Sequence, residues 1–395
     1  MKSFSLIFGM ILMIGRFYVK QVSFIHMADL HLDAPFSSLG DVQKADIRRN
    51  ELENCLRRIV EKVLTQNVDL LIISGDFFED NGVKGSTILT AKNLFSELYK
   101  TEIIICSGNH DPLKENSYYK KTQWSTNVHI LKDSEQVLYL EKYNTCIYNM
   151  GVKGEVSRDY SIILNKNISS QCFNILLFHG TVDMPFEEDN YNPITSKEIF
   201  SLGMDYVALG HMHCYLRLQS ESTVMINPGS PEPLGFDEEG IHGFIQGRLI
   251  QLNDNKKGVE VEYVTSATRH YHKLDVNIND CNSDKEVINR INGQIKLLST
   301  DLYSITLKGF IPKEYNLEVK NILDAFNKSC FFIKIKNHTS IEFNYDEYLE
   351  DPGVRGEFVR RIMDMIDSES SDKQRETLFM AMQYGLQALE NGSVD

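Results

Sequence analysis

The sequence lacks the cysteine pattern of a disulfide-linked protein. Its 395 residues contain seven cysteines, an odd number, which are widely spaced and include no CxxC pair. This usage is typical of a reducing compartment, so we expect a cytoplasmic protein without a disulfide framework. Cys106 and Cys214 flank the motifs described below, and we predict them to be small buried residues and not ligands.

The chain is also short of basic residues. It has 41 Lys and Arg against 55 Asp and Glu, which gives a formal net charge of −14. This balance disfavours broad electrostatic capture of nucleic acid. A local basic patch or bound divalent metal ions remain as sources of positive charge. Lys114, Lys120, Lys121 and Arg217 lie near the motifs, but scattered basic residues are more typical of a solvated face.

No apolar run is long enough to span a bilayer. The stretch FSLIFGMILMIG follows Lys2, and no small-x-small cleavage site comes after it before Arg16. Three interpretations stay open for residues 1–20: a weakly membrane-associating tail, an extension packed on the fold, or the product of an upstream start codon that the working protein does not use. We favour the last, because the first core strand is predicted to begin near Val22.

With 42% hydrophobic and 24% charged residues, the chain is predicted to be globular and long enough for two domains. The first, over 21–265, begins with a βαβαβ pattern and ends with two antiparallel strands. The predicted elements are strand 24–28, helix 46–67, strand 68–74, helix 87–100, strand 102–106, and strands 242–250 and 259–265.

A second α+β domain is predicted over 266–350, with strands at 271–278, 301–311 and 331–337 and helices at 283–298 and 316–329. Residues 351–395 form two amphipathic helices. Their apolar stripes pack either within the chain, which is the default, or on a partner. The stripe residues are Phe358, Ile362, Met365 and Ile366 on one helix, and Leu378, Met382, Leu386 and Leu389 on the other.

Five apolar runs, FIHMA, VDLLIIS, EIIIC, NILLF and YVAL, are each followed by side chains that can bind metal ions. Ligands of open α/β sheets bind beyond the carboxyl ends of the strands, so these side chains are expected to converge. A plain polar turn would explain any one of these places, but not all five together. The candidate ligands are Asp29, His31, Asp76, Asn109, His179, His211 and His213.

Seven mixed ligands are too many for one tetrahedral ion and suit two divalent ions that share a carboxylate. Imidazole and carboxylate ligation without thiolate suits Mn²⁺, our first choice, or Fe²⁺ or Zn²⁺. Two such ions about 3.5–4 Å apart hold a bridging water, lower its pKa to make hydroxide and stabilise displacement at phosphorus. We therefore expect phosphoester hydrolysis.

His110 and Asp111 complete the stretch SGNHDP. We expect His110 to face the substrate, where it stabilises the transition state or protonates the leaving oxygen, and Asp111 to orient the His110 imidazole. The alternative for His110 is a further ligand or a turn residue. His26, His129 and His242 are predicted to be structural, since a hydrogen-bonded core histidine is more common than an isolated ligand.

The motifs DLH, GDFFED, GNHDP, FHG and GHMH, in this order, resemble the signature of calcineurin-like metallophosphoesterases. HMADLHLDAPF, NPGSPEP and the small second domain resemble the DNA-repair exonuclease branch, of SbcD or YhaO type. The resemblance implies a two-layer β-sandwich flanked by helices. It also implies that Asp29, His31, Asp76 and His213 hold one ion, and that Asp76, Asn109, His179 and His211 hold the other.

By the same resemblance, His110 is catalytic, residues near 266–350 form a DNA-capping domain, and the C-terminal helices dock on an SMC-like (SbcC-like) ATPase. Such nucleases are typically Mn²⁺-dependent and often homodimeric, and they act on DNA ends. Our leading hypothesis is a DNA exonuclease or endonuclease of DNA repair. The alternatives are a phosphatase or small-molecule phosphodiesterase on the same core, and a DNA-end scaffold that works through an ATPase.

Overall fold

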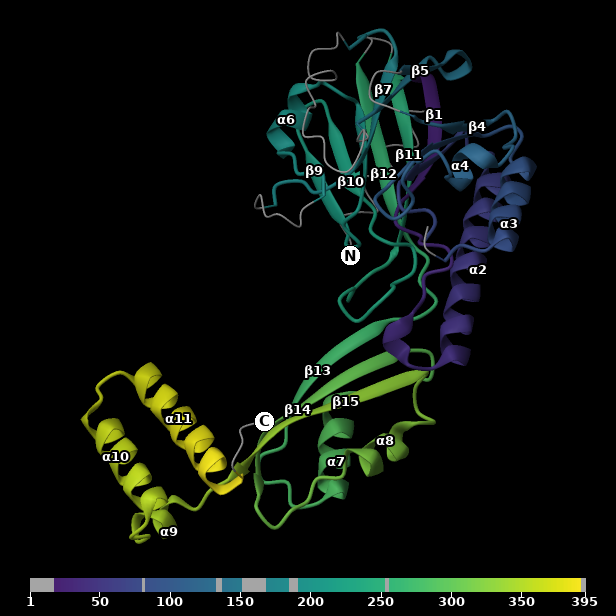
Figure 1. Cartoon of the computed structure of the whole chain (residues 1–395). Helices are drawn as coiled ribbons and strands as arrows, with labels where there is room; N and C mark the ends of the chain where they lie inside the picture. Colours follow the sequence, from purple (N-terminus) through teal and green to yellow (C-terminus); the bar gives the residue numbers. More distant parts are fainter. Residues whose placement is uncertain are drawn as a thin grey trace. The chain divides into compact units, whose positions relative to one another are not determined.

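The computed structural model describes residues 18–79, 82–132, 137–150, 168–184, 191–252 and 256–391 (Figure 1). Most of the predicted extension over 1–20 therefore lies outside the described residues. The chain divides into two compact units, Met1–Tyr271 and His272–Asp395. Among the described residues, none of the helices combines the length and apolarity needed to cross a membrane.

One sheet of the first unit contains the predicted βαβαβ pattern. Its strand order in the described chain is β12-β11-β1-β2-β3-β4, with β1 to β4 parallel and β11 antiparallel to both neighbours. This confirms the expected mixture of parallel and antiparallel strands. The elements are β1 (Tyr18–Met27), α2 (Val42–Gln66), β2 (Leu70–Ser74), α3 (Gly85–Glu97), β3 (Glu102–Cys106), β4 (Val128–Ile130), β11 (Gly243–Leu252) and β12 (Lys257–Thr265).

The middle of the same unit forms a second sheet, with strand order β5-β6-β7-β8-β10-β9 in the described residues. The strands from β6 to β10 in this order are parallel, and β5 and β9 are antiparallel edges. The strands are β5 (Val137–Leu140), β6 (Thr145–Asn149), β7 (Phe173–His179), β8 (Tyr206–Gly210), β9 (Leu216–Gln219) and β10 (Val224–Asn227).

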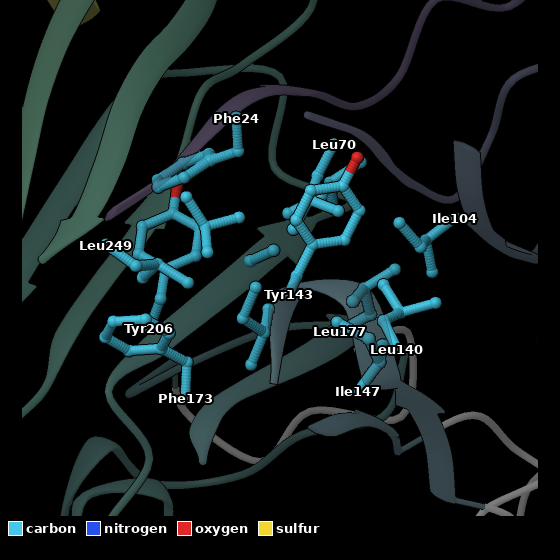
Figure 2. Close-up of a cluster of buried hydrophobic side chains, with 14 of the residues drawn as sticks. Phe24, Leu70, Ile104, Leu140, Tyr143, Ile147, Phe173, Leu177, Tyr206 and Leu249 are labelled. Carbon is cyan, nitrogen blue, oxygen red and sulfur yellow. The ribbon is translucent and has the colours of Figure 1, made fainter. Parts of the chain in front are cut away.

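The two sheets pack face to face around one core. Because side chains alternate along a strand, every second residue of each sheet points into this layer. Figure 2 shows them meeting, with Phe24 and Leu249 from the first sheet against Tyr206 from the second, and Phe24 and Tyr206 have ring centroids 4.7 Å apart. Both sheets therefore bury one face against the other, which confirms the two-layer α/β sandwich.

Helices cover the outer faces of the sandwich, α2 and α3 beside the first sheet and α6 (Ser196–Ser201) beside the second (Figure 1). Helix α2 begins after Asp41, whose carboxylate accepts from the backbone N–H groups of Gln43 and Lys44, and ends at Asn67 in the left-handed region. The predicted start at residue 46 was therefore four residues late. The buried stripe of α2 includes Leu52, Leu56, Ile59 and Val63.

The second unit contains a three-stranded sheet in the order β13-β14-β15, where β14 and β15 are parallel. Its core combines the sheet with α7 and α8, as in the predicted alternation of strands and helices. The elements are β13 (Tyr271–Asn277), α7 (Asp284–Gln294), β14 (Leu302–Pro312), α8 (Val319–Phe326) and β15 (Phe332–Glu342).

The C-terminal segment consists of α9 (Tyr345–Leu349), α10 (Val354–Ser368) and α11 (Asp372–Asn391). Helices α10 and α11 pack on each other through Val359, Ile366, Met382 and Leu386. Packing within the chain thus covers much of the predicted apolar stripes. Two of the predicted stripe residues differ from the expectation, because Met365 and Leu389 are exposed.

Candidate metal centre

The side chains of the five motifs meet at one edge of the sandwich. Asp29, Asp76 and Asn109 follow β1, β2 and β3 of the first sheet, whereas His179 ends β7 and His211 follows β8 of the second. All five strands are parallel to a neighbour, so their carboxyl ends lie at the same edge of each sheet. The expected convergence is present, and it joins two sheets.

The backbone turns sharply where these strands end. Asp29, His31, Asp76 and His211 have positive φ angles of 54°, 47°, 48° and 94°, a region that non-glycine residues seldom adopt. Strain of this kind gathers at sites where the surrounding structure fixes a side chain for function. These turns redirect the side chains from the sheet faces toward a common point.

Two glycines of the motifs are required by the close approach of the site residues. A Cβ atom on Gly75 would lie 2.2 Å from Nδ1 of His179, and one on Gly108 would lie 2.2 Å from Oδ1 of Asp76. Neither neighbour can withdraw without leaving the cluster. Glycine is therefore required at positions 75 and 108, because any side chain there would collide with a candidate ligand.

Three groups of side chains have potential ligand atoms within 4.8 Å of one another: Asp29, His31 and His213; His31, Asp76 and His110; and Asp76, His179 and His211. Asp76 belongs to two of the groups. It lies between His31 on one side and His179 and His211 on the other. Its Oδ2 atom is 3.5 Å from Nε2 of His31 and 3.2 Å from Nε2 of His179. This position suits a carboxylate shared by two ions.

Hydrogen bonds fix which nitrogen of each imidazole faces the cluster. The Nδ1 atom of His31 lies 3.1 Å from Glu79, and that of His213 lies 2.7 Å from Glu238. Ionised carboxylates only accept, so both Nδ1 atoms donate, and in the neutral imidazoles the lone pair is on Nε2. These two Nε2 atoms are 3.2 Å apart. Two lone pairs at that distance repel each other unless a cation or a proton lies between them.

The imidazoles of His179 and His211 lie beside Asn109, and a hydrogen bond also orients the His179 ring. Nδ1 of His179 donates to the backbone carbonyl of Ser74 at 2.8 Å, which leaves the lone pair on Nε2. That Nε2 and Nδ1 of His211 each lie 3.0 Å from the amide oxygen of Asn109. Donor atoms about 3 Å apart have the spacing of ligands at right angles around an ion at roughly 2.1 Å. The residues present therefore fit two divalent cations.

The carboxylates of the site favour positive charge on the groups around them. Burial by itself lowers the pKa of His179 and His213, but nearby carboxylates outweigh it and raise both values to about 9. Burial raises the pKa of Asp76, yet the His179 and His31 imidazoles hold it well below its usual range. His211 differs, because burial and the neighbouring His179 lower its pKa to about 4. The cluster attracts cations, although neutral imidazoles are needed to ligate them.

His110 stands at the solvent side of the cluster. Its side chain is 45% exposed, and its Nδ1 atom lies 3.0 Å from Glu79. The hydrogen bond to Glu79 raises the pKa of His110, and the hydrogen bonds from His110 and His31 lower the pKa of Glu79 to about 2. Glu79 therefore orients two imidazoles at once, with His31 toward the ligand cluster and His110 beside it.

The expected contact between Asp111 and the His110 imidazole was wrong. The Asp111 carboxylate is buried and accepts hydrogen bonds from the Tyr119 hydroxyl and from four backbone N–H groups, those of Asp76, Phe77, Phe78 and Gly108. The acceptor sites of Asp111 are used to hold the turns after β2 and β3. Burial and the neighbouring Asp76 raise the pKa of Asp111 to about 6.

Glu79 and Glu238 were missed in the sequence. Glu79 is the fifth letter of GDFFED, so its motif was noticed but its role was not. Glu238 lies in the acidic run Asp237–Glu239, in which no spacing singles out one carboxylate. Besides His213, Glu238 contacts the Ser230 hydroxyl at 2.7 Å and the backbone N–H of Leu234 at 3.1 Å. The loop that follows β10 therefore supports His213 from behind.

The other histidines have structural partners, as predicted. His26 is buried and bonds to the Tyr206 hydroxyl at 2.8 Å, His129 pairs with Glu102 at 2.7 Å, and His242 bonds to Ser230 and Glu238. Of the two cysteines near the motifs, Cys106 is buried as expected, but the prediction for Cys214 was wrong because it is exposed.

A cleft of about 610 Å³ opens beside the cluster. Its walls combine two candidate ligands with Cys214 and Tyr215, which precede β9, and with the acidic loop. The lining residues are His211, His213, Cys214, Tyr215, Asp237, Glu238, Glu239, Gly240, Ile241 and His242. A substrate can therefore approach the candidate ligands from solvent.

Comparison with known proteins agrees with this geometry. Residues 22–215 match the family model described as Calcineurin-like phosphoesterase. The chain is similar to "Uncharacterized metallophosphoesterase YhaO" of Bacillus subtilis (strain 168), with 27% identity over 78% of this chain and 77% of that protein. It is also similar to two proteins named "DNA double-strand break repair protein Mre11". That of Methanopyrus kandleri is 26% identical over 60% of this chain and 55% of its own length. That of Saccharolobus solfataricus is 26% identical over 68% and 69%.

Proposed function

Residues 22–215 belong to the calcineurin-like phosphoesterase family, and we propose that the protein is a two-metal phosphodiesterase that hydrolyses DNA. The observation that carries the proposal is the convergence of the seven candidate ligands, all with oxygen or nitrogen donor atoms, with the His110 imidazole beside them. The Mre11 relatives, named for DNA double-strand break repair, support DNA as the substrate.

In this proposal one divalent ion would be held by Asp29, His31, Asp76 and His213, and the other by Asp76, Asn109, His179 and His211. The donor set is oxygen and imidazole without thiolate, which favours Mn²⁺, with Fe²⁺ or Zn²⁺ as alternatives. When bound, such ions activate water as a nucleophile and neutralise the charge that develops on the phosphate.

His110 acts as the general acid. Its Nδ1–H donates to Glu79, so its Nε2 atom is the one free to meet the substrate, and the same hydrogen bond raises the pKa of His110, which favours the protonated form. His110 then donates its proton to the oxygen that leaves phosphorus. Glu79 holds the ring in this orientation and stabilises the imidazolium before the transfer.

Other side chains hold the machinery in place. Glu238 keeps the Nε2 lone pair of His213 directed at the cluster, and the Ser74 carbonyl does the same for His179. Asp111 secures the turns that place Asp76 and His110, since it accepts hydrogen bonds from the backbone N–H groups of Asp76 and Gly108. Asp111 is therefore a positioning residue that holds the backbone and does not contact the His110 ring.

The second unit extends the proposal. Residues 266–350 are proposed to cap the DNA, and the helices over 351–395 to dock on an SMC-like ATPase, in a cytoplasmic homodimer. Deletion of residues 353–395 tests the docking: ATPase binding should be lost while hydrolysis of a small diester continues. Unchanged ATPase binding would contradict it.

The test of the function uses end-labelled linear duplex DNA and a small aryl phosphodiester, each with Mn²⁺, with Mg²⁺ or with EDTA. The proposal expects Mn²⁺-dependent shortening of the DNA that is abolished by Asp76→Asn and strongly reduced by His110→Ala. Glu115→Gln, which changes a fully exposed carboxylate, is the matched control and should keep full activity. Hydrolysis of the small diester without DNA cleavage would instead favour a phosphatase or small-molecule phosphodiesterase.

A further inference from the structure

Two cysteine side chains lie against each other in the second sheet, apart from the candidate metal centre. The Sγ atoms of Cys146 and Cys172 are 2.7 Å apart, although the residues are 26 positions apart in the sequence. Cys146 lies in β6, and Cys172 directly precedes the first residue of β7. His179 is the last residue of β7, so the two thiols and the ligand cluster lie at opposite ends of that strand.

Strand pairing explains why the two thiols meet. In the parallel ladder of β6 and β7, Cys146 is the partner of Asn174. Side chains two positions apart point to the same side of a strand, so Cys172 shares a face with Asn174 and therefore with Cys146. The sulfur of Cys172 also contacts the Asn174 side-chain oxygen at 3.5 Å. The sheet register thus places both side chains on the same face of the sheet, within reach of each other.

We propose that Cys146 and Cys172 are a disulfide-forming pair, oxidised by a small-molecule disulfide such as oxidised glutathione. Cys146 is half-buried and Cys172 is buried, so Cys146 is the thiol that the oxidant reaches. The Cys146 thiolate attacks one sulfur of the oxidant, forms a mixed disulfide and releases one glutathione thiolate. The Cys172 thiolate then attacks Cys146 Sγ and releases the second. Two cysteines are oxidised, one disulfide is reduced, and the two protons pass to the released thiolates.

The surroundings make this pair slow to react. Burial and the adjacent Cys172 raise the pKa of Cys146 to about 12, so little thiolate exists at neutral pH. The rate of oxidation is therefore expected to rise about tenfold per pH unit between pH 7 and 9. Such a bond would join the start of β7 to β6 and hold that end of the second sheet together.

The experiment counts thiols in the full-length protein. The reduced protein and the protein treated with oxidised glutathione at pH 8.5 are denatured, alkylated with N-ethylmaleimide and weighed by intact mass spectrometry. The reduced chain should take up seven adducts. The oxidised chain should take up two fewer at these positions, with a Cys146–Cys172 linked peptide after proteolysis. Cys214 is exposed, so Cys214→Ser is the matched control and should form the same link.

A second measurement protects the test from a variant that fails to fold. The melting temperature of the oxidised wild-type protein should exceed that of the reduced protein by roughly 5–10 °C, because the link constrains the unfolded chain. Cys172→Ser should show no such rise. The proposal is overturned if both cysteines stay alkylatable after oxidation, or if Cys146 keeps glutathione without forming the link. Neither outcome bears on the proposed hydrolysis.

Discussion

Glu79 offers the most informative substitution, because one carboxylate holds both a candidate ligand and the candidate acid. Its two oxygens lie 3.1 Å from Nδ1 of His31 and 3.0 Å from Nδ1 of His110. In Glu79→Gln one of these oxygens becomes an NH₂ group, which faces an N–H donor and cannot bond to it. One imidazole therefore loses its partner, and the negative charge beside both is removed.

The expected effect depends on the leaving group. General acid catalysis is worth about 10²–10⁴-fold in rate, and loss of a residue that orients a ligand costs about 10–100-fold. We expect kcat on DNA, whose leaving alkoxide needs a proton, to fall about 10²-fold. On bis(p-nitrophenyl) phosphate, whose leaving group is stable without a proton, the fall should stay below about 10-fold. The alkaline limb of the pH–rate profile should move to lower pH, because His110 loses the carboxylate that raises its pKa.

The assay measures kcat for both substrates between pH 5.5 and 9.5 at saturating Mn²⁺, with bound metal determined on the same samples. Glu102→Gln is the matched control, since it removes a carboxylate 2.7 Å from His129 at the other end of β3. Equal losses on the two substrates, or an unmoved alkaline limb, would refute the role of His110 as an acid held by Glu79.

Four further outcomes are expected. Mn²⁺ affinity, measured by calorimetry, should rise between about pH 7 and 9 and then level off, because His179 and His213, with pKa values raised to about 9, must lose protons to bind metal. Over the same range the metal-free protein should lose stability. A histidine whose pKa is raised on folding stabilises the protein fully below its unfolded pKa, and this stabilisation is lost as the pH rises through the folded pKa of about 9. A denaturation midpoint that does not change with pH would contradict this. Glu238→Gln should weaken Mn²⁺ binding about 10–100-fold in equilibrium dialysis with the fold retained, and unchanged affinity would show that His213 needs no such support. Leu177→Ala should lower the free energy of unfolding by about 2–5 kcal/mol, whereas Leu89→Ala, at an exposed position, should change it little in the same urea titration.

Much of the fold could be read from local patterns. The run EIIIC coincides with β3, because a strand buried on both faces is apolar throughout. Prediction was weaker where polar residues form regular structure. Strand β15 continues through Asn337 to Glu342 because it pairs with β14 along its whole length, and α2 begins early because Asp41 caps it. The strand pairing is set by the tertiary neighbourhood, whereas the Asp41 cap is a local signal that the sequence prediction did not use.

The candidate site shows the same division. The spacing of Asp29 and His31, and of His211 and His213, after apolar strands is a local signal of chelation. The roles of Glu79 and Glu238 are not local, because each meets its histidine only after the chain has folded. The expected pairing of Asp111 with His110 failed for this reason: neighbours in sequence point in different directions once the turn is formed.

What the sequence by itself determined is most of the strands and helices of the first sheet and of the second unit, and the identity of the seven candidate ligands, since these depend on apolar periodicity and on residues next to strand ends. The tertiary structure alone decided that the ligands come from two sheets and that Asp76 lies between the pairs of histidines. It also decided which carboxylates orient the rings, and that Cys146 meets Cys172. These contacts join residues that are dozens of positions apart, and only the pairing of strands within each sheet and the packing of the two sheets set the distances between them.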